Sequence, residues 1–210
     1  MGRYLEASCK LCRREGVKMF LKGGRCFMAK CPVERGRPAP GMHSQRRTKR
    51  SDYGVQLREK QRLRRTYGLR EGPFRNLFKR AQRHQGMTGE RLLQLLELRL
   101  DNVVYRMGAA ASRKAARLFV RHGHVRVNGH KANIPSAVLK TGDVVEIHDR
   151  PAARRLADLF MEEAEGRGQQ TAAWMTVDRS RYRADILREP NRDEVGIDIN
   201  EQLIVELFSK

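Results

Sequence analysis

Four cysteines near the start of the chain have the spacing of a metal site. Cys9 and Cys12 are separated by two residues, Cys26 and Cys31 by four, and thirteen residues lie between the two pairs. Each short spacing lets two sulfur atoms converge on one ion, which favours a tetrahedral four-thiolate zinc centre. Four thiolates also suit an iron–sulfur cluster, which remains the alternative cofactor. Because four protein ligands leave no position for water, we expect a structural metal.

A second group of residues could bind phosphate. Ser112 favours the start of a helix, because its hydroxyl can accept a free backbone N–H, and Gly123 favours an end near His122. At about 100° per residue, four cations fall on one side of this helix, opposite Ala116 and Phe119. These cations are Arg113, Lys114, Arg117 and Arg121. We interpret them as an RNA-binding face; the alternative is a solvated helix face, which most charge runs are.

A β-hairpin is expected directly after this helix. Alternating valines precede Asn128-Gly129, which is typical of a two-residue type I′ turn. Lys131 begins the returning strand, and residues 144–147 indicate a third strand. We add Lys131 and His122 to the candidate RNA contacts. The helix and the strands together predict a small unit with a basic edge.

These residues resemble the S-four RNA-binding module. The resemblance rests on Arg99-Leu100-Asp101, Gly108, Ser112-Arg113, Ala116, Gly123, Val125, Val127-Asn128-Gly129 and Gly142-Asp143. That module also occurs in RNA-modifying enzymes and in some tRNA synthetases, so the rest of the chain must decide the function.

Composition points to a polyanionic partner. The 210 residues contain 44 Lys and Arg against 24 Asp and Glu, a net charge of +20. The charge is graded, from +14 in residues 1–65 through +9 in 66–162 to −3 in 163–210. Nucleic acid is the first candidate for such an excess, and an anionic membrane surface is the second. No apolar run approaches the length of a membrane helix, and nothing at the N-terminus indicates secretion, so we expect a cytoplasmic protein with reduced cysteines.

The first half of the chain indicates a basic arm followed by helices. Residues 32–50 are rich in proline, glycine and cations, which predicts an extended connection that could follow a phosphate backbone. A helix is expected from Ser51 to about Tyr67, a second one ends near Gly86, and Thr88 opens a third. The candidate RNA contacts in this part are Arg46, Arg47, Lys49, Arg50, Arg58, Lys60 and Arg62.

The last part of the chain is expected to extend both domains. Leu156, Leu159 and Phe160 suggest a helix that ends near Gly166. Two strands follow, at 174–177 and 182–187, which could widen the sheet. Asn200 caps a final apolar helix that needs the helical bundle as its partner.

We therefore predict an α+β fold with four segments. A metal-binding arm with its basic linker covers residues 1–45, and a helical domain covers 46–98. An RNA-binding module with helices on a small, mainly antiparallel sheet covers 99–189. The helix in 190–210 returns to the helical domain.

The whole chain resembles the S-four family of bacterial small-subunit ribosomal proteins, in its zinc-containing four-cysteine form. The resemblance is carried by Ser51-Asp52-Tyr53, residues 57–61 and 74–78, Leu100 to Arg106, and Asn200 to Leu203. It implies a structural protein that binds ribosomal RNA at a helix junction of the 5′ domain, nucleates assembly of the subunit body and contributes to translational accuracy. It also implies contacts with ribosomal protein S-five and other small-subunit proteins, and a position near the messenger RNA channel.

Two other functions fit parts of the sequence. In some pseudouridine synthases a catalytic Asp follows an Arg-Leu pair, as Asp101 does here, but Asp101 can also be interpreted as a helix cap, and no catalytic domain remains once the chain is divided. A zinc-containing DNA-binding regulator is the other alternative. We expect no enzyme activity, no small-molecule substrate and no membrane partner.

Overall fold

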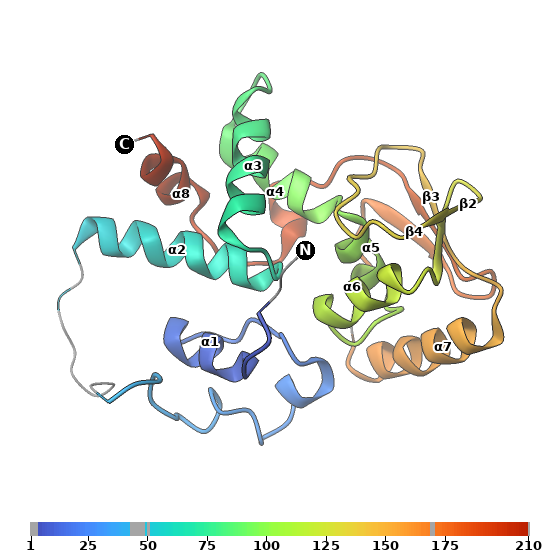
Figure 1. The fold of residues 1–210 in the computed structure, drawn as a ribbon, viewed down its shortest axis with the longest axis horizontal. Helices are drawn as coiled ribbons and strands as arrows, with labels where there is room; N and C mark the ends of the chain where they lie inside the picture. Colours follow the sequence, from blue (N-terminus) through green and yellow to red (C-terminus); the bar gives the residue numbers. More distant parts are fainter. Residues whose placement is uncertain (1–3, 43–48, 50, 169–170, 210) are drawn as a thin grey trace. The chain divides into compact units, whose positions relative to one another are not determined.

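The computed structural model describes residues 4–42, 49, 51–168 and 171–209 (Figure 1). The chain divides into two compact units. One unit comprises Met1–Leu92 and Ile197–Lys210, and we call it the helical unit. The other comprises Leu93–Gly196, and we call it the central unit. The central unit is therefore an insertion in the sequence of the helical unit.

The helical unit is built mainly from helices with recognisable ends. In chain order they are α1 (Ser8–Glu15), the short 3₁₀ helix η1 (Gly23–Cys26), α2 (Asp52–Thr66), α3 (Glu71–Gln82), the first half of α4 (Thr88–Glu97), and α8 (Glu201–Phe208). The Ser51 hydroxyl accepts the Gly54 N–H at 3.2 Å, and the Asn200 side chain accepts the Gln202 N–H at 3.1 Å. Both predicted caps are confirmed. Each one satisfies a backbone donor that the helix itself leaves free.

Helix α8 packs against α2 and α3. The Phe208 ring stacks on Phe78 with centroids 4.3 Å apart and on Phe74 at 6.3 Å, and Ile204 is fully buried. The Gln56 side chain of α2 donates to the Glu206 carboxylate of α8 at 2.9 Å. The two stretches of the helical unit, far apart in sequence, thus share one core.

Helix α3 ends earlier than the sequence predicts. Its last residue is Gln82, not a residue next to Gly86. The His84 N–H donates to the Ala81 carbonyl at 3.1 Å, so the chain forms a tight turn there instead of another helical turn. Residues 82–86 are all polar or glycine and exposed, so nothing in them would be buried by continuing the helix.

The central unit is a five-stranded antiparallel sheet with helices, which confirms the α+β class. Its elements are α5 (Leu100–Arg106), α6 (Arg113–Arg121), β1 (Val125–Val127), β2 (His130–Ala132), β3 (Val144–Ile147), α7 (Pro151–Gly166), β4 (Met175–Asp178), β5 (Arg183–Ile186) and the 3₁₀ helix η2 (Arg192–Val195). The strand order is β2-β1-β3-β5-β4, and every pair is antiparallel. The strands at the end of the chain therefore widen the sheet, as predicted.

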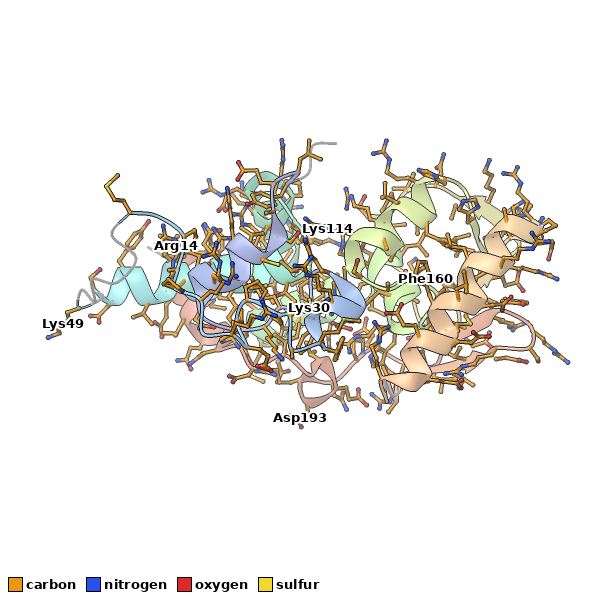
Figure 2. The ribbon with its side chains drawn as sticks, turned by 90° about the horizontal axis from the view of Figure 1, so that it is seen from below. Arg14, Lys30, Lys49, Lys114, Phe160 and Asp193 are labelled. Carbon is orange, nitrogen blue, oxygen red and sulfur yellow. The ribbon has the colours of Figure 1, made fainter. Side chains whose placement is uncertain are left out.

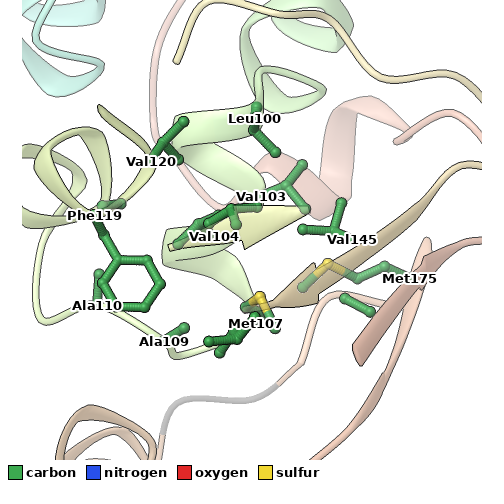
Figure 3. Close-up of a cluster of buried hydrophobic side chains, with 14 of the residues drawn as sticks. Leu100, Val103, Val104, Met107, Ala109, Ala110, Phe119, Val120, Val145 and Met175 are labelled. Carbon is green, nitrogen blue, oxygen red and sulfur yellow. The ribbon is translucent and has the colours of Figure 1, made fainter. Parts of the chain in front are cut away.

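One face of the sheet forms the core of the central unit. Val145 and Ile147 of β3 are buried, and they are in register with Ala184 of β5 and Val125 of β1, which are also buried. Side chains of α5, α6 and α7 fill the same cluster, part of which Figure 3 shows. Residues between these positions, such as Glu146, face away, because successive side chains of a strand point to opposite faces.

The hairpin turn has the predicted geometry. Asn128 and Gly129 both have positive φ, 51° and 79°, which a type I′ turn requires. The Asn128 side chain also accepts the Val144 N–H at 2.8 Å, so the turn is tied to β3. Among the residues that the structure describes, no helix is long and apolar enough to cross a membrane.

Candidate nucleic-acid interface

Helix α6 carries the cationic face that the sequence predicts. The Ser112 hydroxyl accepts the Ala115 N–H at 3.3 Å, and Gly123 after the helix has a φ of 72°. Ala116, Phe119 and Val120 are buried in the core of the central unit. Both ends and the apolar side of α6 are thereby fixed, which turns its cations away from the core.

Arg113 and Arg117 of α6 are engaged inside the protein. The Arg113 guanidinium donates to the Asn102 side-chain oxygen at 2.7 Å, lies 3.7 Å from the Glu97 carboxylate and stacks over the Tyr105 ring at 4.7 Å. The Arg117 guanidinium donates to the Asp101 carboxylate at 3.0 Å. The first half of the predicted stripe therefore holds α6 against α5. Contact of these two residues with RNA stays a prediction.

Glu97 is the centre of this network. Its side chain is fully buried (0% exposed), and Arg106 donates to its two carboxylate oxygens at 2.8 and 3.0 Å. The Asn102 amide donates to the same carboxylate at 3.0 Å and to the Glu97 carbonyl at 2.9 Å. A buried carboxylate needs such partners, because removing it from water is costly. The network joins the end of α4 to α5 and α6.

The contacts of Asp101 indicate a structural role and not a catalytic one. The predicted role of helix cap is wrong: the cap position before α5 is Arg99, and Asp101 lies in the first turn, where a carboxylate is favourable next to the free N–H groups. Arg99 donates to both its oxygens, at 3.0 and 2.7 Å, and Arg117 pairs with it as well. The carboxylate is buried and fully partnered, which is the environment of an anchoring group and not of a nucleophile.

The other end of α6 presents its cations to solvent. Arg121, His122 and Lys131 are exposed, and no carboxylate in the described chain pairs with Arg121 or Lys131. Lys131 of β2 lies over Gly123, where an added Cβ would be 2.5 Å from the lysine Cε. Glycine therefore lets the hairpin cation approach the end of α6. We call Arg121, His122 and Lys131 the hairpin face. The fourth cation of α6, Lys114, is half-buried and is labelled in Figure 2.

The surroundings of the hairpin face are positive. Burial lowers the pKa of His124, and the neighbouring His122, Arg150 and His148 lower it further. Burial also lowers the pKa of His148, followed by Arg126 and Arg150, while Asp149 opposes them. Burial and nearby positive charge thus both disfavour the charged form of these imidazoles. An anion at this face would oppose the part of the shift that comes from charge.

The cations predicted on α2 all have carboxylate partners. Arg58 pairs with Glu15 at 3.3 Å, Lys60 with Glu71 at 2.6 Å, and Arg62 with Glu59 at 3.7 Å. Lys49 is exposed and projects away from the chain (Figure 2). The remaining predicted contacts in the basic connection, Arg46, Arg47 and Arg50, lie outside the described residues.

Sequence reasoning missed a set of cations on α3. The residues in question are Arg75, Lys79 and Arg80 of α3 and Arg83 at its C-terminal cap, all exposed. The sequence does carry a signal for them, because Arg75 and Lys79 directly follow Phe74 and Phe78, the apolar residues that this helix buries.

The four cysteines gather in the N-terminal arm. Cys9 and Cys12 lie on α1, Cys26 ends η1, and Cys31 follows it; all but Cys9 are buried. Burial raises the pKa of the Cys12 thiol, and the other three cysteines raise it further, whereas a backbone hydrogen bond from Met19 opposes this. The Lys22 N–H donates to the Cys26 sulfur at 3.4 Å. The thiols are therefore near enough to repel one another as thiolates.

The arm does not show a preformed metal site. Among the residues for which a structure is described, no three Cys, His, Asp or Glu side chains are arranged to hold a metal ion. The donor set nevertheless suits a thiophilic ion, since a shared cation would remove the repulsion between the thiolates and backbone N–H donors already face two of the sulfurs.

Comparison with known proteins gives matches over the whole chain. The family model described as "Ribosomal protein S4/S9 N-terminal domain" matches residues 3–97, and the "S4 domain" model matches residues 98–145. The small ribosomal subunit protein uS4 of Syntrophomonas wolfei is 51% identical over 212 residues. The proteins of the same name from Anaeromyxobacter sp. strain K and Pelotomaculum thermopropionicum are 50% and 48% identical over 210 residues. Each alignment covers 100% of both chains.

Proposed function

This chain belongs to the uS4 family of small ribosomal subunit proteins, and from that premise we propose that it is a structural, RNA-binding constituent of the small ribosomal subunit in the cytoplasm. The observation that carries the proposal is the similarity to the uS4 proteins along the whole of this chain. The role is structural and not catalytic. The buried, fully partnered Asp101 agrees with this assignment.

The physical basis of RNA binding is charge on a rigid scaffold. The net charge of +20 supplies affinity through phosphate contacts, which do not depend on base sequence. Specificity then comes from the shape of a folded RNA, which exposed cations on two compact units can follow. The hairpin face is our principal contact surface in the central unit, because its cations have no carboxylate partners in the described residues.

We extend the proposal to the partners that the family resemblance implies. These are a helix junction in the 5′ domain of small-subunit ribosomal RNA, ribosomal protein S-five, and messenger RNA near the channel through which it enters. In this role the protein nucleates assembly of the subunit body and contributes to translational accuracy. Lys49, and with it Arg46, Arg47 and Arg50, would supply cations for an extended RNA strand.

We also propose that Cys9, Cys12, Cys26 and Cys31 hold one structural zinc ion. Four cysteines in one arm and two backbone N–H donors to sulfur support it, and zinc bound to the thiolates would cross-link the arm. An iron–sulfur cluster is the alternative. Metal analysis of protein purified without oxygen, with an absorbance spectrum, distinguishes them: one zinc per chain and no visible absorbance supports zinc, whereas four free thiols without metal refute both.

The proposed function is tested by RNA selection. At one salt concentration, the purified chain should bind a 5′-domain fragment of small-subunit ribosomal RNA more tightly than an unrelated folded RNA of equal length or a DNA duplex. Salt must be fixed, because phosphate contacts depend steeply on it. Equal affinity for all three nucleic acids would overturn the proposal.

A further inference from the structure

The helical unit contains two kinds of cation. The first kind is paired: Glu15 contacts Arg58 and Arg65, and Glu71 contacts Lys60 and Arg64. Glu15 has a side chain only 2% exposed, so these pairs are structural and hold α1 and α3 to α2. A cation whose charge is matched by a buried carboxylate has little left to offer an anionic ligand.

The second kind is unmatched, and one group of such cations lies on the outer side of α3. Arg75, Lys79, Arg80 and Arg83 are exposed, and in the part of the chain that the structure describes none of them forms an ion pair with a carboxylate. The only acidic residue on α3 is Glu71, which is engaged by Lys60 and Arg64. The outer side of α3 is therefore uniformly positive.

The orientation of this side is fixed by packing. Phe74, Phe78 and Ala81 are buried, and both rings stack on Phe208 of α8. At about 100° per residue, Arg75, Lys79 and Arg83 fall within about 80° of one another on the opposite side. Successive members are four residues apart, a rise of about 6 Å along the helix. They form a row that winds by about 40° per step around a helix whose orientation is fixed by this packing.

A simpler explanation covers only part of the row. Cations in the last turn of a helix stabilise it by interacting with the helix dipole, and Lys79 and Arg80 are placed there. Arg75 lies in the first half of α3, where the dipole gives a cation no benefit. A dipole role would also appear as a loss of stability on substitution, which can be measured.

We propose that the outer side of α3, carried by Arg75, Lys79, Arg80 and Arg83, is a second RNA-binding surface that contacts the phosphate backbone. The inference rests on the proposed function and assigns part of its RNA contact to the helical unit. Three arginines favour phosphate, since guanidinium binds it through two parallel hydrogen bonds. The row contains no large apolar side chain of the kind that forms the core of a protein–protein interface.

The test measures how RNA affinity depends on salt. The test variant is Arg75→Gln/Lys79→Gln/Arg83→Gln. The control is Arg179→Gln/Arg181→Gln/Arg188→Gln, which loses the same charge at exposed positions of the central unit. In the control the replaced arginines pair with Glu165, Asp178 and Glu194. Each lost phosphate contact should reduce the slope of log affinity against log salt by about 0.7 to 0.9 unit. We expect a reduction of about two units or more for the α3 variant and less than one for the control.

Folding and charge are separated by two further measurements. Both variants should melt at the temperature of the unsubstituted protein, and Arg75→Lys/Arg83→Lys should keep the original slope. Equal slopes for the α3 variant and the control would overturn the inference, and so would a fall in affinity that follows only from a lower melting temperature. If the unsubstituted chain prefers ribosomal RNA while the α3 variant keeps its slope, only this inference fails; if the unsubstituted chain has no preference, the proposed function fails.

Discussion

Replacing Glu97 by Gln tests whether the buried network holds the central unit together. The substitution keeps the shape of the side chain but removes the charge that faces Arg106 and Arg113. It also places an amide donor where Arg106 now donates to both carboxylate oxygens. Two guanidinium groups and the Asn102 amide would then have an incomplete set of acceptors.

The expected loss of unfolding free energy is about 3 kcal/mol. Removing one partner of a buried ion pair typically costs about 3–5 kcal/mol. We take the lower end because the Arg106 side chain is 20% exposed and can regain some water, whereas Glu97 is fully buried. An exposed ion pair would contribute only about 0–1 kcal/mol, so the two cases are well separated.

Urea unfolding followed by circular dichroism measures this difference. With a slope of about 1–3 kcal/mol per molar urea, a loss of 3 kcal/mol moves the midpoint by about 1–3 M. Glu162→Gln on α7 is the matched control, because that side chain is exposed and should change stability by no more than about 0.5 kcal/mol. A loss below about 1 kcal/mol for Glu97→Gln would refute the reasoning and show that water replaces the network without penalty.

Three other outcomes are expected. Gly123→Ala should cost about 1–2 kcal/mol in a thermal melt, because φ is 72° and left-handed backbone is unfavourable for residues with a Cβ; an unchanged melting temperature would contradict it. Asn200→Ala should cost about 1 kcal/mol through loss of the α8 cap, measured in the same way against Asn200→Ser, which can keep it. The lowered pKa values of His124 and His148 favour the neutral folded form, so their contribution to stability should be present above about pH 6.5 and decline as the pH falls below it. Melting at several pH values would show a smaller decline in a variant lacking both imidazoles.

Local sequence signals predicted most of the fold correctly. Ser51, Ser112 and Asn200 each accept a helix N–H as expected, and Asn128-Gly129 has the backbone angles of its turn type. These features depend on residues within a few positions of one another. Short apolar segments next to turn residues likewise predicted the strands, including the two at the end of the chain that join the sheet.

The predictions that failed, or stayed incomplete, concern partners far apart in sequence. The helical pattern placed Arg113 and Arg117 correctly on the polar side of α6, but not opposite Glu97 and Asp101. Likewise the pattern of α2 showed its cations but not the carboxylate of Glu15, 43 residues from Arg58. Periodicity specifies which side of a helix a residue occupies, whereas its partner on that side depends on which distant segment packs there in the tertiary structure.

Pairing, more than charge, therefore separates the roles of the cations in this protein. Arg117 and Arg121 belong to the same row on α6, one turn apart, yet the first lies against Asp101 and the second faces solvent. Reversing the charge at Arg117 would place a carboxylate beside buried Asp101 and destabilise the packing of α6 on α5. A change in RNA affinity could then not be separated from this loss of stability. Neutralising Arg121 disturbs no ion pair in the described residues. Loss of RNA affinity without loss of stability is thus a property that only exposed cations without a carboxylate partner can show, and the described cations of the hairpin face and of the outer side of α3 are of this kind.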